Sequence, residues 1–260
     1  MDRSIIEVGE GFWNIRGSFR IGGIVDIGTH CSLLRLESGR FVLLDACDIS
    51  AAVHDDIKAI TGGPDAIEAL LHLHPFHTMY VEQAHRLFPG ARLFGTKRHH
   101  RLAPELPWQA EHSNEATCHQ QFGPGLDFSV PRGVAFIHDN ENVHFSSVLA
   151  YHRASKTIHV DDTFNFIRAA GPLSRLGLLD AVRLHPTLAQ ALEPRKGAAQ
   201  DFRRWCAGLI EAWNDAENLC AAHTGAWLAR DWPRHSLPSL LSAALESAES
   251  TLLKHEQRHG

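Results

Sequence analysis

The stretch Leu70-Leu71-His72-Leu73-His74-Pro75-Phe76-His77 places three histidines at positions i, i+2 and i+5, directly after an apolar run. Side chains alternate between the two faces of a strand, so His72 and His74 are expected on the same face. Pro75 cannot continue a strand ladder, and the following turn would let His77 fold back toward the other rings. Neutral imidazole is the commonest protein ligand for a zinc-like cation, so this stretch predicts a metal site.

The segments around this stretch predict a layered α/β fold. The region from Ile5 to Asp48 is strand-like, with a hairpin turn signal at Glu37 to Arg40. A helix is expected over 51–61, before the strand 67–71 that delivers the histidines. The pattern then predicts a helix at about 79–87 and strands at 91–96, 126–130, 134–137, 147–152 and 157–160.

The last third of the chain predicts helices. Apolar residues recur at i, i+3 and i+4 in the ranges 172–192, 198–212 and 237–254. No internal repeat, low-complexity tract or long linker interrupts the chain, so we expect one domain over residues 1–260.

The composition excludes several classes of protein. No apolar run reaches 18 residues and no charged-then-apolar leader is present, so we expect no membrane association, no secretory signal and a cytoplasmic location. The net charge is −5 without a Lys/Arg-rich block, which argues against a nucleic-acid partner. The five cysteines are widely spaced and lack a C-x-x-C pair, so we expect reduced, mostly buried thiols.

Further motifs follow the histidine stretch in a fixed order. His144 precedes a predicted strand, Asp162 follows the strand 157–160, and His223 lies two residues before Gly225. With the H-x-H-x-x-H motif, this order resembles the metallo-β-lactamase fold superfamily. That family carries H-x-H-x-D-H at a strand end, then a histidine before a hairpin, an aspartate in G-D-T and a late histidine followed by a small residue.

The resemblance covers roughly Ile5 to Gly225 and implies a four-layer αβ/βα sandwich. About 172–260 would form a mostly helical cover around the strand that carries the last ligand. The resemblance also implies two metal sites. The first would comprise His72, His74 and His144, and the second would comprise His77, His223 and a bridging Asp162.

One position departs from the family pattern. The family has an acidic residue where this chain has Phe76, which can neither bind a second metal nor orient a water. Asp162 is then the best remaining candidate to hold or accept a proton. Asp161 stands where the family has glycine and is a possible substitute, although neighbouring strand residues point to opposite faces. Asp45, at the end of an early strand, is expected to bind nearby backbone or an imidazole.

The resemblance implies a metal-dependent hydrolase with one or two zinc ions, iron or manganese being alternatives. A water on the metal would attack a small ester, lactone, thioester, amide or phosphoester substrate. The alternative is a degenerate member that binds a metal or small ligand with little or no catalysis, which Phe76 favours. An iron-dependent redox protein is a third and less supported reading, and the oligomeric state stays open. The remaining histidines, His30, His99 and His185 among them, are expected at the surface.

Overall fold

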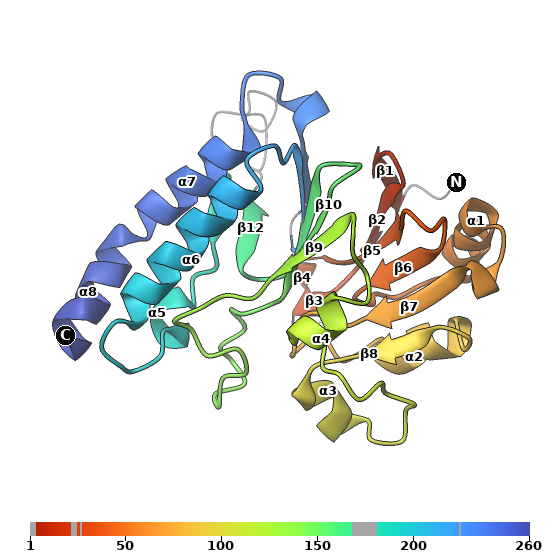
Figure 1. Cartoon of the computed structure of the whole chain (residues 1–260), viewed down its shortest axis with the longest axis horizontal. Coiled ribbons are helices and arrows are strands. Elements are labelled where there is room, and N and C mark those ends of the chain that lie inside the picture. The colour runs from red at the N-terminus through yellow and green to blue at the C-terminus, as the bar shows by residue number, and fades with distance from the viewer. Residues whose placement is uncertain (1–3, 22–24, 27, 168–180, 224) are drawn as a thin grey trace.

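The structure, a computed structural model, describes residues 4–21, 25–26, 28–167, 181–223 and 225–260 (Figure 1). Two β-sheets pack face to face in the middle of the molecule, and helices cover the outer face of each sheet. This arrangement is the four-layer αβ/βα sandwich that the family resemblance implies.

The N-terminal sheet has six strands in the order β1-β2-β5-β6-β7-β8. Its last three strands run parallel, because helices α1 (Ala51–Thr61) and α2 (Val81–Leu87) connect them. A separate two-stranded sheet is made of β3 (Arg20–Ile21) and β4 (Val25–Asp26). The six strands are β1 (Ile5–Gly9), β2 (Phe12–Gly17), β5 (Thr29–Arg35), β6 (Phe41–Leu44), β7 (Ile67–Leu71) and β8 (Arg92–Phe94).

Helix α1 shows how local sequence sets these boundaries. The Ser50 hydroxyl accepts a hydrogen bond from the Val53 N–H and caps the N-terminus. Gly62 ends the helix in the left-handed region, at φ 82°, where a residue without Cβ is unstrained. Both ends of α1 therefore fall where the sequence predicts.

The C-terminal sheet has five strands in the order β15-β14-β11-β10-β9. Strands β11 and β14 pair in parallel, so their carboxyl ends meet at one edge of the sheet. The five strands are β9 (Leu126–Ser129), β10 (Leu149–His152), β11 (Thr157–Val160), β14 (Asn218–Ala221) and β15 (Ala226–Leu228).

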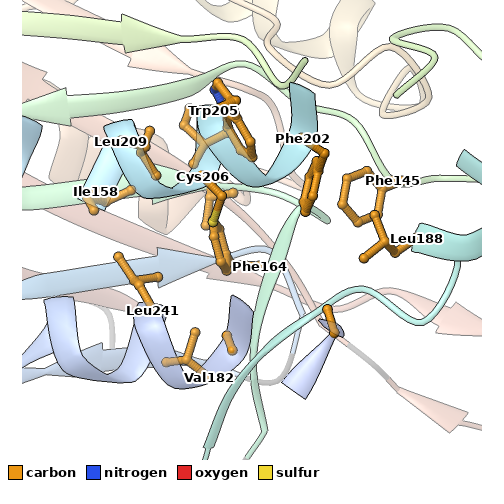
Figure 2. Packing of buried hydrophobic residues seen from close by; sticks show 14 of the residues in the cluster. Phe145, Ile158, Phe164, Val182, Leu188, Phe202, Trp205, Cys206, Leu209 and Leu241 are labelled. Atoms are coloured by element: carbon orange, nitrogen blue, oxygen red, sulfur yellow. The ribbon is translucent and has the colours of Figure 1, made fainter. Parts of the chain in front are cut away.

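Three helices cover this second sheet: α6 (Ala198–Ala212), α7 (Leu237–Ser247) and α8 (Glu249–His259). Figure 2 shows Phe202 and Cys206 of α6 packed among side chains of the sheet and its loops. Short helices and 3₁₀ turns complete the connections: α3 (Lys97–Leu102), α4 (Ala116–His119), α5 (Leu188–Ala191), Pro64–Ala66 and Ala229–Asp231.

An apolar cluster lies between the two sheets. Phe12, Leu34 and Leu71 of the first sheet share it with Ala150 and Cys220 of the second. All five cysteines are buried free thiols, as expected. No helix in the described part of the chain has the length and apolarity needed to cross a bilayer.

The structure corrects part of the predicted C-terminal section. The helix expected over 172–192 falls partly on 168–180, which lie outside the described residues. Residues Ala181–Leu184 form strand β13, because they pair antiparallel with β12 (Phe164–Ile167). The segment 134–137 forms no strand, and the helix expected over 237–254 is two helices that meet at Ala248.

Candidate metal centre

The histidine stretch leaves the sheet at the end of β7. The His72 N–H donates to the Phe94 carbonyl at 2.9 Å, so the pairing with β8 extends one residue past the strand. The Asp45 carboxylate then accepts the N–H groups of Leu73, at 2.8 Å, and His74, at 3.3 Å. This expected role of Asp45 turns the chain away from the sheet.

His74, His77 and Asp162 converge just beyond that turn, with potential ligand atoms within 4.8 Å of one another. Asp162 Oδ2 lies 3.2 Å from His74 Nε2 and 3.8 Å from His77 Nε2. Asp162 Oδ1 lies 3.0 Å from His223 Nε2. The parallel pairing of β11 and β14 explains this meeting, because Asp162 and His223 each follow one of those strands.

The donor set fits a zinc-class ion. Two ligands of one tetrahedral ion at bond lengths of about 2.1 Å stand roughly 3.4 Å apart, close to the separations found here. His223 Nδ1–H donates to the Gly28 carbonyl at 2.9 Å, so Nε2, which faces Asp162 Oδ1, is the nitrogen that could bind an ion. His74 Nε2 is buried and forms no well-aligned hydrogen bond within the described part of the chain.

His74 would need one adjustment to bind through Nε2. Its Nδ1 accepts the Phe76 N–H at 3.1 Å, so the neutral ring carries its proton on Nε2. Binding at Nε2 would move that proton to Nδ1 and give up the contact with Phe76. His223 would likewise give up the hydrogen bond between its Nε2 and Asp162.

Charge at this centre is concentrated on Asp162. Burial by itself would raise the pKa of Asp162, but the charge of His74 and a hydrogen bond with His223 hold that pKa well below its usual range. Burial lowers the pKa of His77, against the attraction of Asp162. Burial would also lower the pKa of His223, but its hydrogen bond with Asp162 outweighs this and raises it. A carboxylate that stays ionised suits a cation ligand.

His144 lines the same pocket but is held at its rim. The centroid of its ring lies 4.6 Å from that of the Phe76 ring, with the two planes at 15°, and 6.2 Å from that of the His74 ring. His144 Nε2–H donates to the Glu141 carbonyl, so only Nδ1 is left to bind an ion. Arg98 forms a 2.6 Å ion pair with Glu141 and lies over the Phe76 ring.

His72 does not join the group. Its fully buried ring lies beside those of His99 and Trp108, with centroids 5.4 Å and 6.0 Å away, and neither ring nitrogen has a hydrogen-bond partner among the described residues. Burial lowers the pKa of His72 to about 4. The structure thus brings together four of the six sequence-predicted ligands, keeps His144 beside them and places His72 among other neighbours.

A pocket of about 520 Å³ opens over the group. His185 and Asn142 line it, and neither was predicted as a site residue from the sequence. His185 follows β13, the strand that was predicted as helix, so no sequence signal pointed to it. The other lining residues are Phe19, Thr29, Ala46, Phe76, His77, Thr78, Met79, Tyr80, His144, Asp162 and His223.

Solved structures of similar fold exist. No family model matches the sequence, and no curated protein matches it either. A metallo-β-lactamase from Erythrobacter litoralis with β-mercaptoethanol in the active site matches with a TM-score of 0.60 at 13% identity, over 96% of this chain and 98% of that one. A metallo-β-lactamase from Hirschia baltica matches with a TM-score of 0.58 at 15% identity, over 93% and 95%. FIM-1 from Pseudomonas aeruginosa, in its mono-zinc form, gives 0.57 at 11% identity, over 94% and 95%.

Proposed function

We propose, from the premise that this chain has the metallo-β-lactamase fold, that it is a metal-dependent hydrolase. The observation that carries the proposal is the convergence of His74, His77, His223 and Asp162 under a pocket of about 520 Å³. Three imidazoles and one carboxylate are enough donors for one zinc-class ion, and a water would bind as a fifth ligand. Iron and manganese are the alternatives to zinc.

An ion held by these residues would polarise a substrate oxygen and lower the pKa of a water. Asp162 is the only carboxylate among the described residues that line the pocket, so we assign it to orienting the attacking water. Its depressed pKa keeps it ionised and able to accept a hydrogen bond at neutral pH. His72 and His144 remain predicted ligands of a first ion, which would require both rings to leave their present contacts.

The pocket favours small substrates with an apolar part. Phe19, Phe76, Met79 and Tyr80 give it an apolar wall, and Asn142 adds an amide that can donate to a substrate oxygen. We propose an ester, lactone, thioester, amide or phosphoester as the substrate class.

The test is metal analysis of protein purified without chelator, followed by turnover of a substrate from each class. We expect one equivalent of metal and hydrolysis of at least one class, both lost in His74→Ala. His235→Ala changes an exposed histidine outside the pocket and should keep both. A chain that takes up no zinc, manganese or iron would refute the proposal.

A second candidate function is metal or ligand binding with little catalysis. The stack of Phe76 on His144 favours it, because an apolar ring occupies the position where the family supplies a carboxylate. One equivalent of metal without turnover of any substrate class would support this candidate over the hydrolase.

A further inference from the structure

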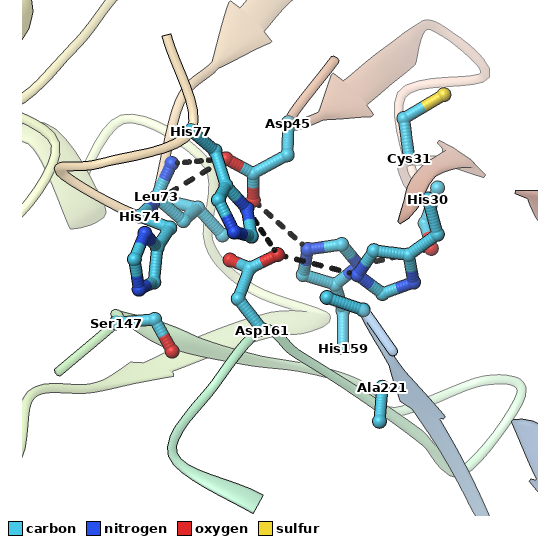
Figure 3. A network of polar contacts seen from close by, with 12 residues as sticks. His30, Cys31, Asp45, Leu73, His74, His77, Ser147, His159, Asp161 and Ala221 are labelled. Carbon is cyan, nitrogen blue, oxygen red and sulfur yellow. Dashed lines mark hydrogen bonds and ion pairs between the residues drawn. The ribbon is translucent and has the colours of Figure 1, made fainter. Parts of the chain in front are cut away.

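A buried polar network lies directly behind the metal-ligand candidates (Figure 3). His30 and Asp161, together with Asp45 and His159, are fully or almost fully buried between the two sheets. His30 was expected at the surface, so its burial in this network corrects that expectation. Its contacts fix where the protons of two histidines lie.

The first of these histidines is His30. The Asn14 side-chain Nδ2 donates to His30 Nδ1 at 3.0 Å. The amide is oriented by three further contacts: Nδ2 also lies 3.0 Å from Ser32 Oγ and 3.3 Å from the Cys31 carbonyl, and Oδ1 accepts from Arg16 at 3.4 Å. Because His30 Nδ1 accepts, the neutral ring carries its proton on Nε2. That nitrogen lies 3.3 Å from Asp161 Oδ1.

The second histidine is His77, whose Nδ1 lies 3.3 Å from the same Asp161 oxygen. Because this oxygen also faces the Nε2–H of His30, it acts as an acceptor, and an acceptor oxygen attracts an N–H group and repels a nitrogen lone pair at this distance. The favourable tautomer of His77 therefore has its proton on Nδ1. Its Nε2 lone pair is then free on the side of Asp162, 3.8 Å away.

A second metal ion within this network is disfavoured by ring geometry, although His30, His159 and Asp161 lie close enough to hold one. The rings of His30 and His159 are stacked, with centroids 4.4 Å apart and planes at 6°. An imidazole binds a metal in its own plane, and two stacked planes cannot both contain one ion. His159 is already engaged, with Nε2 at 3.0 Å from Asp45 and Nδ1 at 2.9 Å from Ser32 Oγ.

We propose that Asp161, backed by His30, is a positioning residue that holds His77 in the tautomer with Nδ1 protonated and Nε2 free to bind a metal. Its importance for the reaction rests on the proposed function, whereas the tautomer itself does not. Carboxylates that orient ligand histidines in this way commonly change metal affinity by about 10- to 100-fold.

The test is nitrogen-15 NMR of histidine-labelled protein, in which the ring nitrogens report their protonation directly. His77→Gln identifies the His77 signals by their loss. In the wild-type chain treated with EDTA, we expect a protonated Nδ1 and an unprotonated Nε2. Asp161→Asn should shift these signals toward a mixture of tautomers and weaken zinc binding by about 10- to 100-fold in a chelator competition.

Thr157→Val is the matched control, because it removes a buried polar group from β11, the strand that precedes Asp161, and lies outside the network. It should change neither readout. A wild-type His77 with its proton on Nε2 would overturn the proposal, and this spectrum needs no variant that must fold. Unchanged His77 signals in Asp161→Asn would overturn it as well. A tautomer shift in a chain that binds no zinc would support the positioning role and refute the proposed function alone.

Discussion

The rings of Phe76 and His144 stack with centroids 4.6 Å apart, and the Arg98 guanidinium lies 4.8 Å from the Phe76 centroid. An apolar ring thus stands beside the candidate metal centre, at the position where the family that the sequence resembles carries an acidic residue. The stack and the Glu141 carbonyl together keep His144 at the rim of the pocket. The position of Phe76 therefore explains why the candidate ligands form a single cluster and His144 stays outside it.

Phe76→Asp should raise the metal content from one toward two ions per chain, because it supplies a carboxylate and releases His144. The measurement is metal content after dialysis against metal-containing buffer. Phe76→Ala is the control, since it releases His144 without adding a charge, and it should stay at one. Equal stoichiometry in Phe76→Asp and the wild type would show that Phe76 does not limit the site.

Substitutions of the four converging residues should weaken zinc binding most. We expect His77→Ala, His223→Ala and Asp162→Ala each to lower zinc affinity by more than ~100-fold, beyond what a supporting residue contributes. His72→Ala should lower zinc affinity less than tenfold, because the His72 ring lies against His99 and Trp108 and not among the four converging residues. Chelator competition measures all of these affinities. An equal loss in His72→Ala and His77→Ala would contradict the ligand set.

Asp45 should be the most costly carboxylate to remove for stability. It accepts the Leu73 and His74 N–H groups and contacts His159, all in the dry interior. Asp45→Ala leaves these donors unpaired and should lower the free energy of unfolding by about 3 kcal/mol or more. Asp45→Asn keeps the shape and should cost less. Urea denaturation checks the order, and exposed Asp55→Asn should stay within about 0.5 kcal/mol of the wild type.

Stability of the metal-free chain should fall as the pH drops, in part through His72. Burial lowers the folded-state pKa of His72 to about 4 from the ordinary 6.5, so the unfolded chain binds this proton first. The contribution of neutral His72 to the free energy of unfolding is complete above pH 6.5. It is lost between pH 6.5 and pH 4, at about 1.4 kcal/mol per pH unit.

The variant that isolates this effect is His72→Phe, which keeps a ring in the cavity and removes the titrating group. We expect its free energy of unfolding, measured by urea at several pH values with EDTA present, to fall less steeply with decreasing pH than that of the wild type. The difference in slope should correspond to about one fewer proton taken up on unfolding. Identical slopes in the variant and the wild type would contradict the buried, neutral state of His72.

Several features of this fold could be predicted from local sequence because local rules decide them. The run before His72 gives β7, and Ser50 and Gly62 set the ends of α1. The separation of His72 from His74 could not be predicted. Two-residue periodicity holds only within a strand, and Asp45, far away in sequence, turns the chain at Leu73.

The buried polar network behind the metal centre could not be predicted from local sequence either. His30 lies in β5 of one sheet and Asp161 follows β11 of the other. Only the packing of the two sheets brings His30 Nε2 to 3.3 Å from Asp161 Oδ1. Strand β13 was missed because its pairing with β12 outweighs a helix-like apolar spacing. Long-range pairing, and not intrinsic preference, decides such segments.

The central claim is that one ion binds between His74, His77, His223 and Asp162. The most direct test is anomalous X-ray diffraction at the zinc edge, from crystals of the zinc-loaded chain. We predict one peak within about 2.0–2.2 Å of three imidazole nitrogens and an Asp162 oxygen. A peak bound by His72 and His144 instead, or no peak inside the pocket, would contradict the account.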